Sequence, residues 1–206
     1  MALAGCPVLS DAAALPIRAA ATIVVLRRGD EPAVLMGQRG ADAAFMPSKF
    51  VFPGGAVDPG DHSMGHLGAD CLRRLALPPD GPNAQAITGA ALRELTEETG
   101  LRLRPGAPLR FIFRAITPPG RSRRFDARFL LANADDIDGN HADFSGADLE
   151  LAHLQWVPLT AARGLDLPFI TDVVLAEVAA ITRGENQPGV PFFDNSGPVP
   201  TFRRLV

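Results

Sequence analysis

The sequence is poor in several features, and each scarcity limits what the protein can be. Cys6 and Cys71 are the only cysteines, too few for a disulfide framework or a zinc pattern, so two free thiols in a reducing cytoplasm are expected. No apolar run approaches 18 residues, so no membrane span is expected. Lys49 is the only lysine beside 19 arginines, which we attribute to genome composition. The net charge of −3 gives no argument for a nucleic-acid or membrane partner.

The pattern of apolar residues predicts an α/β fold with a mixed sheet. A chain of 206 residues with 47% hydrophobic residues fits one domain with a packed core. The β-branched run in residues 19–27 and the segment 33–38 predict a hairpin. Along the chain, strands come first, a helix interrupts them, strands resume and a helix follows, an order that favours a mixed sheet with packed helices. No glycine-rich phosphate loop follows the first strand, which disfavours a dinucleotide-binding fold. Further strands are expected at residues 50–52, 109–117, 125–132 and 154–157, helices at 70–77, 85–99 and 169–183, and extended arms at 1–17 and over the last twenty residues.

Three acids in the helix expected at residues 85–99 carry the strongest functional signal. Glu94, Glu97 and Glu98 stand at offsets of three and four, which brings them onto one helical face within about one turn. Like charges so close repel each other and do not stabilise a helix. A hard divalent cation relieves the repulsion, because such ions prefer carboxylate oxygens. The pattern therefore predicts a metal site on this helix, with Gly100 placed to cap its end.

This helix and an earlier glycine turn together resemble the Nudix box, whose pattern is GX5EX7REUXEEXGU, with U a bulky aliphatic residue. Residues 93–101 match every defined position of the second half. In the first half Gly55 matches, but Asp61 stands where the family has glutamate. The gap also differs, because 31 residues separate Asp61 from Arg93 where the pattern has seven, so 24 are extra.

A split box of this kind is similar to those of the Nudix branch that includes peroxisomal coenzyme A diphosphatases. Residues 50–55 and 124–129 also resemble that branch. The resemblance implies one Nudix domain over residues 1–206, folded as an α/β/α sandwich with a mixed sheet. The insertion at about 62–84 lies inside the motif, with extensions at both ends. It is expected to be either a lid or substrate wall, or a tolerated surface excursion.

The resemblance also assigns roles to the residues of the motif. Glu94, Glu97 and Glu98 would bind one or more Mg²⁺ or Mn²⁺ ions, and the carbonyl of Gly55 would add a ligand. Arg93 stands four residues before Glu97 and can hold that carboxylate across one helical turn. Such a site suits hydrolysis of a diphosphate, because the metal neutralises phosphate oxygens and lowers the pKa of a bound water.

The general base and the phosphate-binding groups are less narrowly defined. Glu94 is one candidate base, and Glu150 is the other, since Nudix enzymes often take their base from outside the box. Four arginines are candidate substrate-binding residues through bidentate contacts with phosphate, although each could equally be a solvated surface charge. They are Arg39, Arg121, Arg123 and Arg124.

Two classes of function follow. The first is a cytoplasmic, metal-dependent pyrophosphohydrolase acting on a small nucleoside diphosphate derivative, with coenzyme A or an acyl-coenzyme A as the leading substrate. ADP-ribose and dinucleotides are the alternatives. The second is a non-catalytic nucleotide-binding Nudix module, against which the intact Glu94, Glu97 and Glu98 argue. Because related enzymes are often dimers, the resemblance also implies a homodimer.

Overall fold

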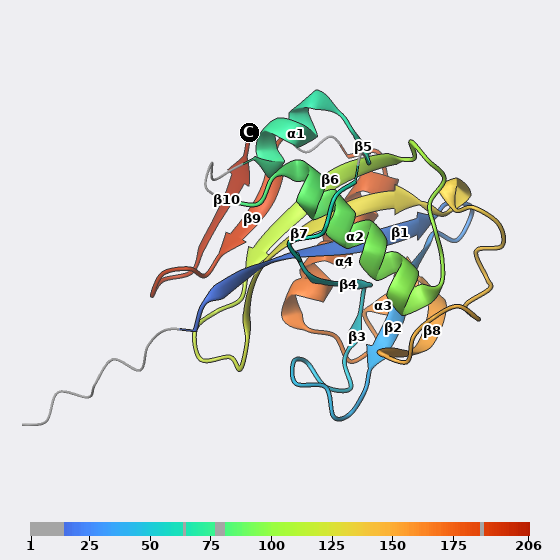
Figure 1. The fold of residues 1–206 in the computed structure, drawn as a ribbon, viewed down its shortest axis with the longest axis horizontal. Coiled ribbons are helices and arrows are strands. Elements are labelled where there is room, and N and C mark those ends of the chain that lie inside the picture. The colour runs from blue at the N-terminus through green and yellow to red at the C-terminus, as the bar shows by residue number, and fades with distance from the viewer. Residues whose placement is uncertain (1–14, 64, 77–80, 186–187) are drawn as a thin grey trace, which may run out of the picture.

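The computed structural model describes residues 15–63, 65–76, 81–185 and 188–206, and Figure 1 shows its fold. Strands and helices alternate in the order expected for an α/β protein. The strands are β1 (Ile17–Arg27), β2 (Ala33–Arg39), β3 (Phe50–Val51), β4 (Gly54–Ala56), β5 (His66–Leu67), β6 (Pro108–Ile116), β7 (Arg124–Asn133), β8 (Leu151–Pro158), β9 (Val190–Asp194) and β10 (Thr201–Leu205). The helices are α1 (Ala69–Leu75), α2 (Ala84–Thr99), α3 (Leu159–Ala162), α4 (Phe169–Thr182) and the short 3-10 turn η1 (Ala134–Asp136).

The strands form a mixed sheet, with the order β10-β9-β6-β7-β1-β2-β3 along its main path. The central strand β1 runs parallel to β7 and antiparallel to β2, so the expected hairpin is present. Strand β8 also pairs with β2, and the short β4 pairs with the first half of β1. This pairing carries the glycine turn of residues 54–55 to the middle of the sheet, where the acidic helix crosses it.

Two hydrophobic cores lie on opposite faces of the sheet, and β1 contributes to both. Its side chains alternate, so that Ile23 and Val25 belong to the core beneath α2, and Val24 and Leu26 to the core beneath α4. All four are fully buried. Figure 1 shows α2 in front of the sheet and α4 behind it. The mixed α/β sandwich predicted from the sequence is therefore confirmed.

Helix α2 begins and ends at residues suited to its two caps. The side chain of Asn83 accepts a hydrogen bond from the backbone N–H of Ala86 at 2.8 Å. Gly100 adopts the left-handed conformation, with φ of 75°, and its N–H bonds the carbonyl of Thr96. Ile87, Ala90, Ala91 and Leu95 form the buried stripe of this helix. The cap at Gly100 expected from the sequence is present.

The remaining elements differ from expectation mainly at the C-terminal end. In the expected extended arm, residues 190–205 form the β9–β10 hairpin, and β9 pairs in parallel with β6, so this hairpin extends the sheet. The described residues of the insertion pack on the domain, since β5 pairs with β6, and Leu75 of α1 is 1% exposed in the core. Cys71 is a free thiol, whereas Cys6 and most of the 1–17 arm lie outside the described residues. Among the described helices, none has the length and apolar character needed to cross a bilayer.

Candidate functional site

The two halves of the split motif meet because the backbone at residues 61–62 lies directly against Gly89 of α2. A Cβ atom at Gly89 would stand 2.7 Å from the backbone nitrogen of His62, so this approach requires glycine. Asp61 is thereby brought next to Arg93, one helical turn further along. The Nε of Arg93 donates to Oδ1 of Asp61 at 2.8 Å, and its Nη2 donates to Oδ2 at 3.1 Å. Despite the long insertion, Asp61 remains in contact with the motif helix.

Arg93 also organises two of the motif glutamates. Its Nη1 donates to Oε1 of Glu94 at 2.8 Å and to Oε2 of Glu97 at 2.9 Å, and its Nη2 donates to the carbonyl of Ala56 at 3.0 Å. The contact with Glu97 is the one that the spacing of four residues predicts. Hydrogen bonding to Arg93 holds the pKa of Asp61 below its usual value. Arg93 therefore joins the glycine turn, the aspartate and the acidic helix.

Glu98 is the most deeply buried acid of the motif, with 1% of its surface exposed. Its Oε2 accepts a hydrogen bond from the backbone N–H of Gly54 at 2.8 Å, but no donor in the described parts of the chain bonds its Oε1. Burial raises the pKa of Glu98 to about 8, against the opposing effects of the Gly54 N–H and the nearby Arg39. A buried carboxylate oxygen without a donor is costly, so this position suits a positively charged ligand.

The other two glutamates differ from each other in their surroundings. Glu94 lies against the glycine turn, where a Cβ at Gly55 would stand 2.2 Å from its Oε1. Burial raises the pKa of Glu94, and hydrogen bonding to Arg93 opposes the shift. The Glu97 side chain is half exposed and is directed toward Arg93. Within the described ranges, no three acidic, His or Cys side chains converge as a ready-made metal site, because Glu94 and Glu97 are bonded to Arg93 while Glu98 points to the glycine turn.

Two residues outside the motif complete this region. Arg39, at the end of β2, donates through Nη1 to Oε1 of Glu150 at 2.9 Å, and through Nη2 to the carbonyl of Gly54 at 3.4 Å. The same Nη2 lies 4.0 Å from Oε1 of Glu98. Glu150 precedes β8 and is half exposed. The fold thus brings Glu150, which is far from the motif in sequence, to the edge of the glycine turn.

The three arginines at the hairpin tip between β6 and β7 differ in their exposure to solvent. Arg121 and Arg123 are exposed and line the pocket described below. Arg124 is buried, and it donates through Nε to the carbonyl of Thr117 at 3.0 Å and through Nη2 to the carbonyl of Asn195 at 2.8 Å. Because these contacts tie the hairpin to the segment after β9, the expectation that Arg124 binds substrate is corrected, and it is removed from that set.

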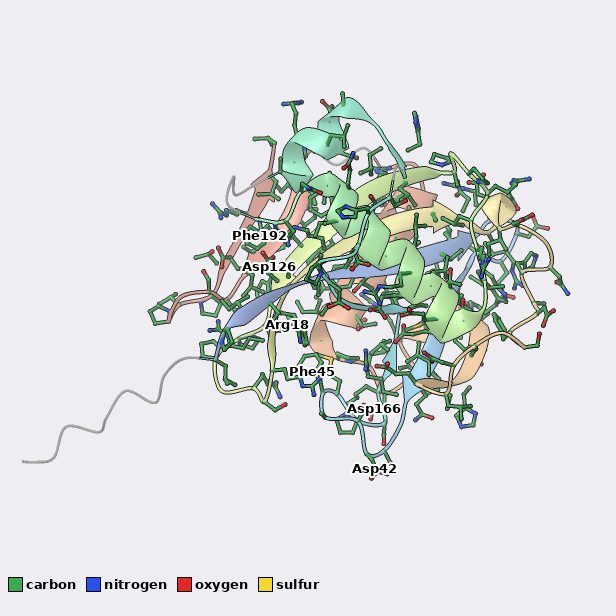
Figure 2. The ribbon with its side chains drawn as sticks, in the orientation of Figure 1. Arg18, Asp42, Phe45, Asp126, Asp166 and Phe192 are labelled. Carbon is green, nitrogen blue, oxygen red and sulfur yellow. The ribbon has the colours of Figure 1, made fainter. Side chains whose placement is uncertain are left out.

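A pocket of about 860 Å³ opens beside the glycine turn, a volume suited to a small ligand. One part is polar and is lined by Arg39, Gly54, Gly55 and Glu150. The wall also includes several phenylalanines, and the rings of two of them, Phe45 and Phe125, meet edge to face with centroids 5.2 Å apart. Figure 2 shows Phe45 on the loop that follows β2 and Asp42 at the lower tip of the same loop. A smaller cavity of about 400 Å³ lies between this loop, Arg123 and Glu150.

Some of these positions could not be read from the sequence. Phe45 falls in the 41–49 segment, whose only local signal was that of a loop. The described part of the 62–84 insertion contributes no residue to the pocket wall, so it packs on the core instead of lining the ligand space. Trp156 is partly buried against the core beneath α2 and donates from Nε1 to the carbonyl of His141 at 2.9 Å.

Comparison with known proteins agrees with this geometry. A NUDIX domain family model matches residues 16–176, whereas a comparison with curated proteins finds no match. A NUDIX hydrolase from Alicyclobacillus acidocaldarius has 29% sequence identity and a TM-score of 0.58, over 80% of this chain and 92% of the other. A NUDIX hydrolase from Nitrosomonas europaea has 13% identity and a TM-score of 0.53, over 81% and 91%.

A further similar structure is the NUDIX domain of Shewanella oneidensis NrtR, complexed with ADP ribose. It has 13% identity and a TM-score of 0.53, over 84% of this chain and 93% of the other. At such low identity the last two structures show the fold alone. The family match covers most of the chain, and the Alicyclobacillus structure is similar in fold, with 29% identity. The protein therefore belongs to the NUDIX domain family and is a Nudix hydrolase.

Proposed function

We propose that the protein hydrolyses the diphosphate linkage of a nucleoside diphosphate derivative and uses Mg²⁺ or Mn²⁺ to do so. The observation that carries this proposal is the Glu98 carboxylate, buried at the glycine turn with Oε1 free of any donor in the described residues. Glu94 lies at the same turn, and the resemblance predicts that the carbonyl of Gly55 adds an oxygen ligand. An all-oxygen set of this kind suits a hard divalent cation.

The metal would be held by Glu98 and the Gly55 carbonyl, and by Glu94 and Glu97 after rotation of these two carboxylates from their bonds with Arg93 toward the ion. When bound, it would neutralise phosphate oxygens and lower the pKa of a coordinated water. Arg93 holds Glu94 and Glu97 on the turn of α2 that faces this site. Two groups could accept the proton of the attacking water, Glu94 from within the motif and Glu150 from the pocket edge.

The exposed arginines of the hairpin tip would bind the phosphates on the side away from the metal. Arg121 and Arg123 line the pocket, and planar guanidinium groups match phosphate oxygens in bidentate geometry. The aromatic wall formed by Phe45 and Phe125 offers ring surface to a planar or apolar part of the substrate. The pocket therefore combines a charged end for the diphosphate with an apolar wall for the group attached to it.

Coenzyme A and its acyl thioesters are the leading substrates in this proposal. The support is the split motif together with residues 50–55 and 124–129, which resemble the coenzyme A branch of the family. ADP-ribose and dinucleotides are the second class to test, and the NrtR domain complexed with ADP ribose is a reason to include that compound. A homodimer remains a prediction from the resemblance, and sedimentation equilibrium tests it.

The test is a panel of coenzyme A, acyl-coenzyme A, ADP-ribose and NADH, incubated with Mg²⁺ or Mn²⁺ in ¹⁸O-labelled water. Product masses would show which bond breaks and which phosphorus takes up the label. We expect turnover that EDTA abolishes and that Glu98→Gln lowers by orders of magnitude, whereas the exposed Glu31→Gln behaves as wild type. Tight nucleotide binding without any turnover would favour the non-catalytic module instead.

A further inference from the structure

Arg39 occupies an unusual place in the site, because its guanidinium reaches acceptors from three separate segments. It bonds the Glu150 carboxylate at 2.9 Å and the Gly54 carbonyl at 3.4 Å, and it lies 4.0 Å from Glu98. Its side chain is 17% exposed, which is much less than the 55% of its partner Glu150. Arg39 thus faces inward, toward the acids and the glycine turn.

The backbone around this pair sets its geometry. Arg39 of β2 pairs with Leu151 of β8, so Glu150 is one residue from the position opposite Arg39 in the sheet. The segment that carries Glu150 is also tied to the motif helix. The backbone N–H of Glu150 donates to Oδ1 of Asp148 at 2.9 Å, and the N–H of Asp148 donates to the carbonyl of Glu97 at 2.7 Å. The Glu150 backbone is therefore held on two sides, by β2 and by the end of α2.

The side chain of Glu150, however, has one strong tether. At 55% exposure a glutamate samples many rotamers unless a partner selects one. The hydrogen bond from the Arg39 guanidinium to the Glu150 carboxylate, at 2.9 Å, favours one rotamer of Glu150, because charge-assisted hydrogen bonds have a defined direction. The Nη2 of Arg39 is fixed in turn by the Gly54 carbonyl, beside the proposed metal ligands. Arg39 therefore links the orientation of Glu150 to the turn where the substrate phosphorus would lie.

We infer that Arg39 is a positioning residue that holds the Glu150 carboxylate toward the glycine turn for its work as general base. This inference rests on the proposed function, and it replaces the expectation that Arg39 binds substrate phosphate directly. The two roles make different predictions. A phosphate ligand contributes to substrate binding whether or not Glu150 is present, whereas a positioning residue has no further effect once Glu150 is removed.

The kinetic test compares Arg39→Ala, Arg39→Lys, Glu150→Gln and the double variant Arg39→Ala/Glu150→Gln. We expect Glu150→Gln to lower kcat by about 10²–10⁴-fold, and Arg39→Ala to lower kcat by about 10–100-fold with little change in KM. The double variant should be no slower than Glu150→Gln alone, and Arg39→Lys should recover part of the loss. Arg163→Ala, which breaks an exposed ion pair elsewhere, is the matched control.

A binding measurement adds a readout that does not depend on turnover. The probe is α,β-methylene-ADP, titrated calorimetrically with Mg²⁺ present. A positioning role leaves its affinity for Arg39→Ala within about twofold of wild type, whereas a phosphate ligand loses about tenfold or more. Weakened probe binding, or kcat losses that multiply in the double variant, would overturn the inference while leaving wild-type hydrolysis intact. Absence of wild-type turnover on the panel would overturn the proposed function itself.

Discussion

Asp61 and Arg93 are 32 positions apart in the chain, yet they form a two-pronged ion pair in which Nε and Nη2 of the arginine reach both carboxylate oxygens. The pair closes the insertion at its base, because one partner stands before it and the other stands in the helix after it. Aspartate has a shorter side chain than the glutamate of the family pattern. The close approach of the residue 61–62 backbone to Gly89 makes up the difference.

Removing the charge of Asp61 should therefore destabilise the fold. Asp61 is 6% exposed, and Asp61→Asn would weaken two charge-assisted hydrogen bonds, each of a kind that contributes about 1.5–3 kcal/mol. We expect the free energy of unfolding in urea to fall by about 2 kcal/mol. Asp58→Asn is the control, since Asp58 is exposed and its oxygen lies 3.9 Å from Arg93. Equal stability of the two variants would show that the Asp61 pair contributes little.

Gly89→Ala tests whether the insertion is anchored at that glycine. Helix propensity alone favours alanine by about 1 kcal/mol. Here the new Cβ would stand 2.7–3.0 Å from three backbone atoms of Asp61 and His62, so steric strain should reverse the sign. We expect a loss of about 1–3 kcal/mol in urea denaturation together with reduced turnover. Gly197→Ala, where a Cβ meets nothing within 4 Å, should leave both unchanged.

The fold could be predicted from the sequence where the local pattern was strong. Strand β1 could be predicted from its β-branched run, and helix α2 from its apolar spacing and its caps, because these signals lie within a few residues of each other. The β9–β10 hairpin was anticipated only as an extended tail. Its strands are separated by residues 195–200, which contain Pro and Gly, and its parallel pairing with β6 leaves no local signal.

The site shows the same division between local and long-range information. Contacts within one turn of α2, such as that of Arg93 with Glu97, follow from spacing. The meeting of Arg39 with Glu150 depends on the pairing of β2 with β8, across 111 positions. Arg124 was grouped with its neighbours at the hairpin tip. The alternation of β7 turns it inward, onto the same face as Arg128.

The raised pKa of Glu98 predicts how pH affects the metal-free protein. Its carboxyl has an ordinary value of 4.5 and a value of about 8 in the fold, so the folded state holds this proton more tightly than the unfolded state. Stability should then fall as pH rises from about 4.5 toward 8, because the unfolded chain releases the proton first. We expect melting in EDTA to show this fall and Glu98→Gln to flatten it. If Glu98→Gln shows the same dependence of melting temperature on pH as wild type, Glu98 is not the cause of the fall.

Magnesium should counteract that loss. A carboxylate must be deprotonated to bind a metal, so affinity at Glu98 should increase as pH rises toward and past 8. The expected result is a rise in Tm on adding Mg²⁺ that is larger at pH 8 than at pH 5.5, with the difference absent in Glu98→Gln. Differential scanning calorimetry at matched ionic strength measures it. A Mg²⁺ effect that does not depend on pH would place the bound ion elsewhere.

Phe45, in the aromatic part of the pocket wall, is expected to contribute to substrate affinity. Phe45 meets Phe125 edge to face at 5.2 Å, and both line the pocket. The loop that carries Phe45 is tied to the hairpin tip, where Ser122 Oγ donates to the carbonyl of Ala44 at 3.0 Å. Phe45→Ala removes ring surface remote from the scissile bond, so it should raise KM by about 3–10-fold while kcat stays near wild type. Leu72→Ala, on the exposed face of α1, controls for the loss of apolar surface alone. A fall in kcat with KM unchanged would instead show that Phe45 acts on the reacting end of the pocket.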